Sequence, residues 1–290
     1  MSAALRCSQS RREPCAYDEF RSRPVTLLLS FYSSSGIVFA ADSAITQSTA
    51  NKAAVRKGKQ RKLLKVSTVG VNGAIVGFFG LAVVGTEPMD TWLARKLRAW
   101  AGGKTAAELG DYLRDELSRE VPDVHRLNNA SGLHIGAFER RGQIAVPVMQ
   151  YVTNIYHLDT ITGVYSDFRE YRSEEHFPSH PSPESSWTLY PANQLRRHLQ
   201  EYERGHGFPH WFRNGDLAFS ARPWEGLRDA VNSLRGDLRH RGLKSPEDLR
   251  LWSALAKTIV TTVGDLYGIL GTQGAPLIEG PYVTESLAWP

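Results

Sequence analysis

Thr26–Thr46, with the sequence TLLLSFYSSSGIVFAADSAIT, is the stretch that decides the fold. Val25–Tyr32 and Ile37–Ala41 are apolar and rich in β-favouring residues, so they predict two strands. The turn residues Ser33–Gly36 join them. Asp42 follows the second strand directly. A carboxylate at the end of an apolar strand is partly buried, so we expect it to have a partner.

Lys62 opens the next strand-like run, KLLKV. Amide hydrolysis by a threonine needs a base for the hydroxyl, and a free α-amine with a pKa of about 8 can serve at neutral pH. A lysine close to the hydroxyl lowers the pKa of that hydroxyl, and an aspartate orients the lysine. Thr26, Asp42 and Lys62 therefore supply the parts of an N-terminal-nucleophile hydrolase. Gly77, in the run AIVGFFG, is a candidate for the backbone N–H that binds the developing oxyanion.

These residues resemble the proteasome β-subunit family, which includes the bacterial HslV peptidase. Gly36–Asp42 (GIVFAAD) is similar to the Gly-hydrophobic-Ala-Asp segment that ends the second strand of that family. Counting back from Asp42 without a gap places Thr26 on the nucleophile position. The resemblance implies that Thr46 binds the substrate backbone and that Gly77 lies in the oxyanion segment.

Arg61–Leu63 resembles the segment that carries the lysine of the family. The chain is longer than is typical between Asp42 and Lys62, so Lys59 and Lys65 are alternatives for this role. Asp265 and Ser220 are candidates for the groups that support the free amine. The resemblance extends over about 26–121.

The coarse order of elements is four strands, two helices, two strands, a loop-rich segment, two helices and a strand. Grouped strands and paired helices favour stacked sheets with helical layers outside. Together with the resemblance, this order predicts an α+β fold, a four-layer αββα sandwich. Capping signals support the helices: Thr105 and Glu108 form a capping-box pattern, and Ser245-Pro246 begins a long helix. Trp92 and Trp100 lie on an apolar helix face that is either core or subunit contact.

The domain prediction places a leader, or a mis-assigned start, at 1–25 and one hydrolase domain at 26–290. A loop-rich insertion is expected at about 155–215. Thr26 becomes N-terminal if 1–25 are removed. The alternative is that translation starts at Val25, since GTG can serve as a bacterial start codon, and the initiating methionine is then removed.

Composition excludes several classes of protein. The chain has 290 residues, of which 41% are hydrophobic, and no apolar run is long enough to span a membrane. The 1–24 region lacks the apolar stretch of a secretory signal, so we expect a cytoplasmic location. The net charge is +5, but no nucleic-acid-binding motif accompanies it, so a nucleic-acid partner is not favoured. Four histidines in the loop-rich segment are interpreted as surface residues, with no metal or cofactor expected: His176, His180, His206 and His210.

The resemblance implies a threonine-type peptidase that forms an acyl-enzyme on Thr26 and cleaves polypeptides. It also implies a homo-oligomeric ring, served by an AAA+ ATPase that unfolds substrates. Two alternatives remain open: a catalytically inactive ring subunit of the same fold, and an amidohydrolase for small amides.

Overall fold

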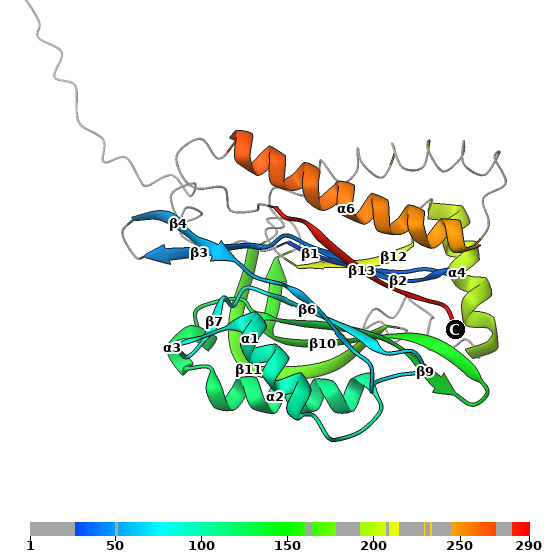
Figure 1. Cartoon of the computed structure of the whole chain (residues 1–290), viewed down its shortest axis with the longest axis horizontal. Coiled ribbons are helices and arrows are strands. Elements are labelled where there is room, and N and C mark those ends of the chain that lie inside the picture. Colours follow the sequence, from blue (N-terminus) through cyan, green and yellow to red (C-terminus); the bar gives the residue numbers. More distant parts are fainter. Residues whose placement is uncertain are drawn as a thin grey trace, which may run out of the picture.

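The computed structural model describes residues 27–49, 52–159, 164–177, 192–206, 209–214, 245–270 and 280–290, together with the single residues 229 and 233 (Figure 1). Thr26 and Ser220 lie outside the described residues.

The stretch that opens the sequence analysis folds into the centre of a four-stranded antiparallel sheet. Its strand order is β12-β1-β2-β13. The bounds are β1 Leu28–Tyr32, β2 Gly36–Ala41, β12 His210–Asn214 and β13 Val283–Ala288. The turn at Ser33–Gly36 is closed by the N–H of Ser33, which donates to the carbonyl of Gly36 at 2.8 Å. The two predicted strands and their turn are confirmed.

A five-stranded antiparallel sheet has the order β11-β10-β9-β6-β5. Its strands are β5 Leu63–Val66, β6 Ala74–Phe79, β9 Gly132–Arg141, β10 Ile144–Asp159 and β11 Val164–Phe177. Two hairpins stand apart as two-stranded sheets: β3 Ala44–Thr49 with β4 Lys52–Lys59, and β7 Val83–Val84 with β8 Glu87–Pro88. The first of these hairpins follows Asp42 closely and contains Thr46.

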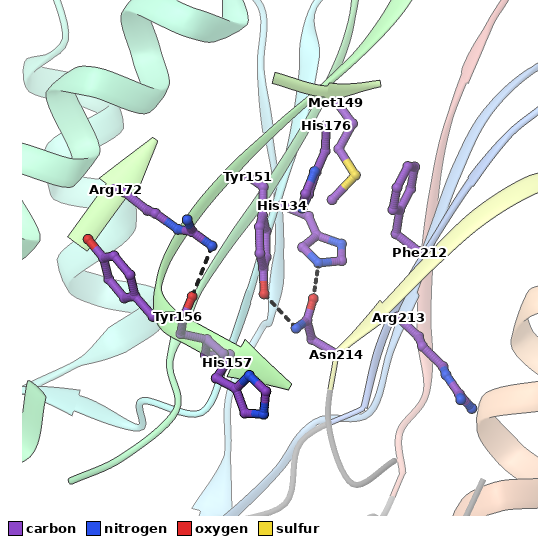
Figure 2. A pocket seen from close by; sticks show the side chains of 11 residues that line it. His134, Met149, Tyr151, Tyr156, His157, Arg172, His176, Phe212, Arg213 and Asn214 are labelled. Carbon is purple, nitrogen blue, oxygen red and sulfur yellow. Dashed lines mark hydrogen bonds between the residues drawn. The ribbon is translucent and has the colours of Figure 1, made fainter. Parts of the chain in front are cut away.

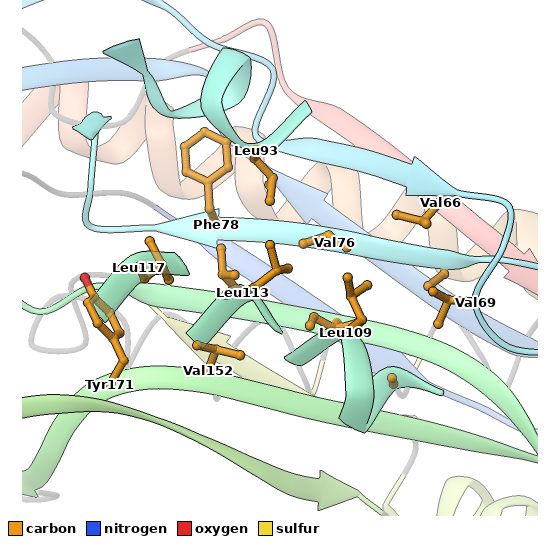
Figure 3. Packing of buried hydrophobic residues seen from close by; sticks show 14 of the residues in the cluster. Val66, Val69, Val76, Phe78, Leu93, Leu109, Leu113, Leu117, Val152 and Tyr171 are labelled. Atoms are coloured by element: carbon orange, nitrogen blue, oxygen red, sulfur yellow. The ribbon is translucent and has the colours of Figure 1, made fainter. Parts of the chain in front are cut away.

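Helices cover the outer faces of both large sheets (Figure 1). Their bounds are α1 Met89–Ala99, α2 Ala106–Glu120, α3 Asp123–Arg126, α4 Ala192–His206 and α6 Ser245–Leu270. The helix α2 begins with the predicted capping box between Thr105 and Glu108. Its leucines pack on the five-stranded sheet (Figure 3). Trp92 of α1 is buried in the same cluster, so it is a core residue. On the other side, α6 packs against β1, β2 and β13.

A second hydrophobic core lies between the two large sheets. Leu28 and Phe39 from the four-stranded sheet meet Leu63 and Phe79 from the five-stranded sheet. Gly77 allows a close approach here, because a Cβ on this residue would lie 2.7 Å from Cδ1 of Leu28. This core brings the start of β1 against the start of β5, which is where the candidate site lies.

The prediction of a four-layer αββα sandwich is wrong. The described chain is a mixed α/β fold of antiparallel sheets with more strand than helix. Among the described helices, α6 alone packs on the outer face of the four-stranded sheet, and α4 packs against β10 and β12. Leu195 and Leu199 of α4 are buried in the core between the sheets. The helix α4 thus lies at one end of the sheets and places two side chains in the core between them, which departs from four regular layers (Figure 1).

The segment at 155–215, expected to be an exposed loop, contributes regular structure to both sheets. The end of β10 and the whole of β11 extend one sheet, and β12 forms an edge of the other. His176 and His210 lie in these strands and stack on aromatic rings, so they are not surface loop residues. No helix within the described ranges is both long enough and apolar enough to cross a membrane.

Candidate active site

Asp42 and Lys62 form a buried ion pair at the start of β1. The Nζ of Lys62 lies 2.9 Å from each carboxylate oxygen of Asp42. The side chain of Lys62 is 2% exposed, and that of Asp42 is 0% exposed. The sequence analysis proposed this pairing across 20 residues of chain, and the structure brings the two residues together.

Backbone hydrogen bonds hold the carboxylate of Asp42 against the first residue of the described chain. The N–H of Leu27 donates to Oδ1 of Asp42 at 2.9 Å, and the N–H of Ala44 donates to Oδ2 at 3.1 Å. The carbonyl of Leu27 accepts from the N–H of Asp42 at 3.3 Å. Lys62 is fixed in turn because its carbonyl accepts from Phe78 N–H on β6 at 3.2 Å. The carboxylate is thus anchored to the residue that follows Thr26.

The ammonium of Lys62 contacts both carboxylate oxygens of Asp42, but both groups are removed from water. Burial lowers the pKa of Lys62, because removing the ammonium from water costs more than the attraction of Asp42 returns. Burial also raises the pKa of Asp42, against the effects of Lys62 and the two backbone donors. Both pKa shifts favour the neutral forms. The loss of hydration on burial is the largest cause of each shift. Such groups are often found where a protein performs chemistry.

The other sequence-predicted site residues are placed less directly. Thr26 lies outside the described residues, and in the sequence it directly precedes Leu27. Thr46 lies in β3, where its Cα pairs with that of Arg56. Lys59 is exposed at the end of β4, and Lys65 pairs with Glu285 at 3.0 Å with its side chain 49% exposed. Of the three candidate lysines, Lys62 is the one that contacts Asp42. Asp265 is exposed on α6.

Gly77 occupies the middle of an inner strand. Its Cα pairs with Leu63 on β5 and with His134 on β9, and its missing side chain makes room for Leu28. The structure therefore gives Gly77 a packing role beside the ion pair, and its role as oxyanion donor stays a prediction. Gly80 ends the same segment with a φ of +77°, and a Cβ there would collide with the carbonyl of Ala130.

A hydrogen-bonded network that the sequence analysis missed crosses the core between the sheets. The Nδ1 of His134 lies 3.0 Å from Oγ of Ser30, and its Nε2 contacts Oδ1 of Asn214. The Nδ2 of Asn214 donates to the hydroxyl oxygen of Tyr151 at 2.7 Å. Because an amide oxygen only accepts, His134 carries its proton on Nε2 and accepts the Ser30 hydroxyl hydrogen on Nδ1. The network connects strands β1, β9, β10 and β12.

One signal for this network was present in the sequence. In Gly132–Phe138 (GLHIGAF), residues of alternate parity face opposite sides of a strand, and His134 is the polar residue on one of those faces. Its partners are 104 and 80 residues away in the chain, so their identity could not be read from local spacing.

His134 should make stability depend on pH. Burial lowers its pKa to about 3 from an ordinary value of 6.5. A depressed folded-state pKa gives stability that is complete above 6.5 and is lost as pH falls toward 3. Between pH 7.5 and 5 the protein should lose about 2 kcal/mol of unfolding free energy through this group. The measurement is urea unfolding at both pH values for the wild type and His134→Gln. An equal pH dependence in both proteins would contradict this assignment.

Comparisons with known proteins show that this chain is similar to solved structures, two of which are described here. One is titled Anbu (ancestral beta-subunit) from Yersinia bercovieri; it is 14% identical, with 91% of this chain and 81% of that chain covered, at a TM-score of 0.43. The other is an Anbu (Gly-1) mutant from Hyphomicrobium sp. strain MC1; it is 12% identical, with 75% and 96% covered, at a TM-score of 0.27. No protein-family model matches the sequence, and no curated protein is similar to it.

These titles correct the resemblance drawn from the sequence. The neighbours are Anbu proteins, so the assignment to the proteasome β-subunit family with HslV is wrong. The motif behind that assignment is a strand pair ending in Asp42, plus one lysine, and so short a pattern describes a local site rather than a family. Ring assembly, the ATPase partner and the polypeptide substrate stay predictions.

Proposed function

We propose that the chain is an amide hydrolase that uses Thr26 as an N-terminal nucleophile, with peptide bonds as its substrate. The observation that carries the proposal is the buried Asp42–Lys62 pair, hydrogen-bonded to the N–H of the residue next to Thr26. A buried ion pair is costly, and replacement by apolar residues is often neutral or stabilising. Its location at the start of β1 is accounted for if it acts on the residue before Leu27.

In the proposed reaction the α-amine of Thr26 acts first as a base and then as an acid. The α-amine of Thr26 takes the hydroxyl proton while Oγ1 forms a bond to the carbonyl carbon of the substrate. Lys62, held by Asp42, stabilises the oxygen as it loses its proton. The C–N bond then breaks, and the leaving amine receives the proton from the α-amine. Water hydrolyses the acyl ester in the second half of the reaction and regenerates the free hydroxyl.

Covalent labelling tests this function. A peptide with a carboxy-terminal epoxyketone or vinyl sulfone should modify a chain that begins at Thr26, and peptide mapping should place the adduct on that residue. Thr26→Ala should abolish labelling, because no hydroxyl remains at that position. A matched control is Thr49→Ala, on the β3–β4 hairpin, which should label normally. Equal labelling of wild type and Thr26→Ala would contradict the proposal.

The alternative of a catalytically inactive subunit makes the opposite prediction. In that case the Asp42–Lys62 pair is a structural contact, and a chain that begins at Thr26 neither labels nor hydrolyses peptides. The small-amide alternative predicts labelling by a short acyl electrophile, with no cleavage of unfolded protein.

A further inference from the structure

A cavity of about 270 Å³ opens between the two large sheets (Figure 2). Strands of both sheets line it, and the β10, β11 and β12 side chains dominate. The lining includes His134, Met149, Tyr151, Arg172, His176, Phe212 and Asn214. Its volume lies just below the range of about 300–1,000 Å³ typical of sites for drug-sized molecules. It therefore suits one side chain better than a length of peptide.

Strand pairing places this cavity beside the start of β1. The Cα of Asn214 pairs with that of Leu28, and Leu28 also pairs with Ala41, the residue before Asp42. The ion pair thus lies on the β2 side of β1, and the cavity lies on the β12 side. Thr26 is two residues from Leu28, which is at most about 7 Å of chain. A group bonded to Thr26 would be within reach of the cavity.

Several polar groups of the lining already have partners within the protein. Asn214 uses its oxygen on His134 and its nitrogen on Tyr151, and the low pKa of His134 keeps that ring uncharged at neutral pH. Arg172 donates to the carbonyl of Ile155 at 3.2 Å and pairs with Glu174 at 3.1 Å. The Nε of Arg172 is buried without a hydrogen-bond partner in the described part of the chain, so the lining keeps one polar donor.

Aromatic and thioether groups form the rest of the wall. Tyr151 stacks on His176 with ring centres 5.0 Å apart, and His176 stacks on Phe212 at 6.0 Å. Met149 lies beside these rings (Figure 2). Aromatic rings and methionine sulfur both pack favourably against another ring. No carboxylate lines the cavity within the described residues, so it offers no counter-ion to a basic side chain.

We propose that this cavity is a specificity pocket that binds one uncharged aromatic side chain of the substrate. The proposal rests on the function proposed above, since it is the acyl group on Thr26 that would deliver the side chain. Phenylalanine and tyrosine meet the description. Lysine and arginine do not, because their charge would be buried without a partner.

Binding and turnover are measured separately so that the two proposals can fail separately. The binding probes are N-acetyl-phenylalaninamide and N-acetyl-lysinamide, followed by NMR titration of the whole chain. The aromatic probe should bind at least about tenfold more tightly than the basic one. Met149→Phe, which fills the cavity, should weaken binding of the aromatic probe by a similar factor. Met89→Phe is the matched control, because Met89 is equally buried but belongs to the core under α1.

A second variant covers the case in which Met149→Phe does not fold. Phe212→Leu removes a ring from the wall without adding volume, and it should also weaken binding of the aromatic probe. Equal binding of both probes would contradict the proposal of an aromatic pocket. The proposal would also be contradicted if neither Met149→Phe nor Phe212→Leu changed binding of the aromatic probe. Aromatic binding without peptide hydrolysis supports the pocket and refutes the proposed function. In an active chain, the variants should raise KM for a phenylalanine peptide more than KM for an alanine peptide.

Discussion

Replacing Lys62 by methionine is expected to lower the free energy of unfolding by about 3–5 kcal/mol, because it leaves the carboxylate of Asp42 buried without a counter-ion. The same change should abolish labelling of Thr26. Urea unfolding and the labelling rate measure the two effects on one protein preparation. The stability of a typical domain is about 5–15 kcal/mol, so the variant should still fold.

The double variant Lys62→Met/Asp42→Asn separates folding from chemistry. It removes both buried charges and keeps an amide oxygen that can accept from Leu27 N–H. Much of the lost stability should return, while labelling stays absent because no cation faces Thr26. Lys65→Met is the matched surface control, since that lysine is half exposed and pairs with Glu285. Labelling at the wild-type rate in Lys62→Met would remove the lysine from the mechanism.

The second large effect concerns the α-amine of Thr26. A chain that begins at Thr26 should hydrolyse an aromatic peptide about 10²–10⁴ times faster than a chain that begins at Val25, because the extra residue converts the amine into an amide that cannot act as base. The two chains differ by one residue, and the described core begins after it, at Leu27. Steady-state kinetics on both chains measure the ratio.

Circular dichroism and urea unfolding serve as controls for that comparison, and both chains should unfold alike. Equal rates from the two chains would show that the free amine takes no part. In that case Thr26 would not be an N-terminal nucleophile, whatever the role of the ion pair.

Local patterns in the sequence predicted much of the fold because they carry local physical signals. The capping residues Thr105 and Glu108 mark the start of α2, and Ser245 begins α6 as expected. The strands predicted on either side of the Ser33–Gly36 turn are β1 and β2. The Asp42–Lys62 contact was also foreseen, since a carboxylate after an apolar strand requires a partner and a lysine begins a nearby strand.

The remaining structure depends on contacts between distant segments. The strands β11 and β12 occur where prolines, serines and histidines suggested loops, and they are strands because they pair with β10 and β1. The strand β4 is rich in basic residues, which are not typical of strands. Among the described strands it pairs with β3. The network of Ser30, His134 and Asn214 joins three strands that no local pattern relates. The layering was mispredicted because α4 places Leu195 and Leu199 in the core between the sheets.

The central claim is that Thr26 presents a free amine beside the buried ion pair, and the intact mass of the protein purified from its natural host tests it most directly. The account predicts a mature chain that begins at Thr26 and lacks 1–25. A mature chain that still carries Ser2–Val25 would contradict it, because the amine of Thr26 would then be part of a peptide bond.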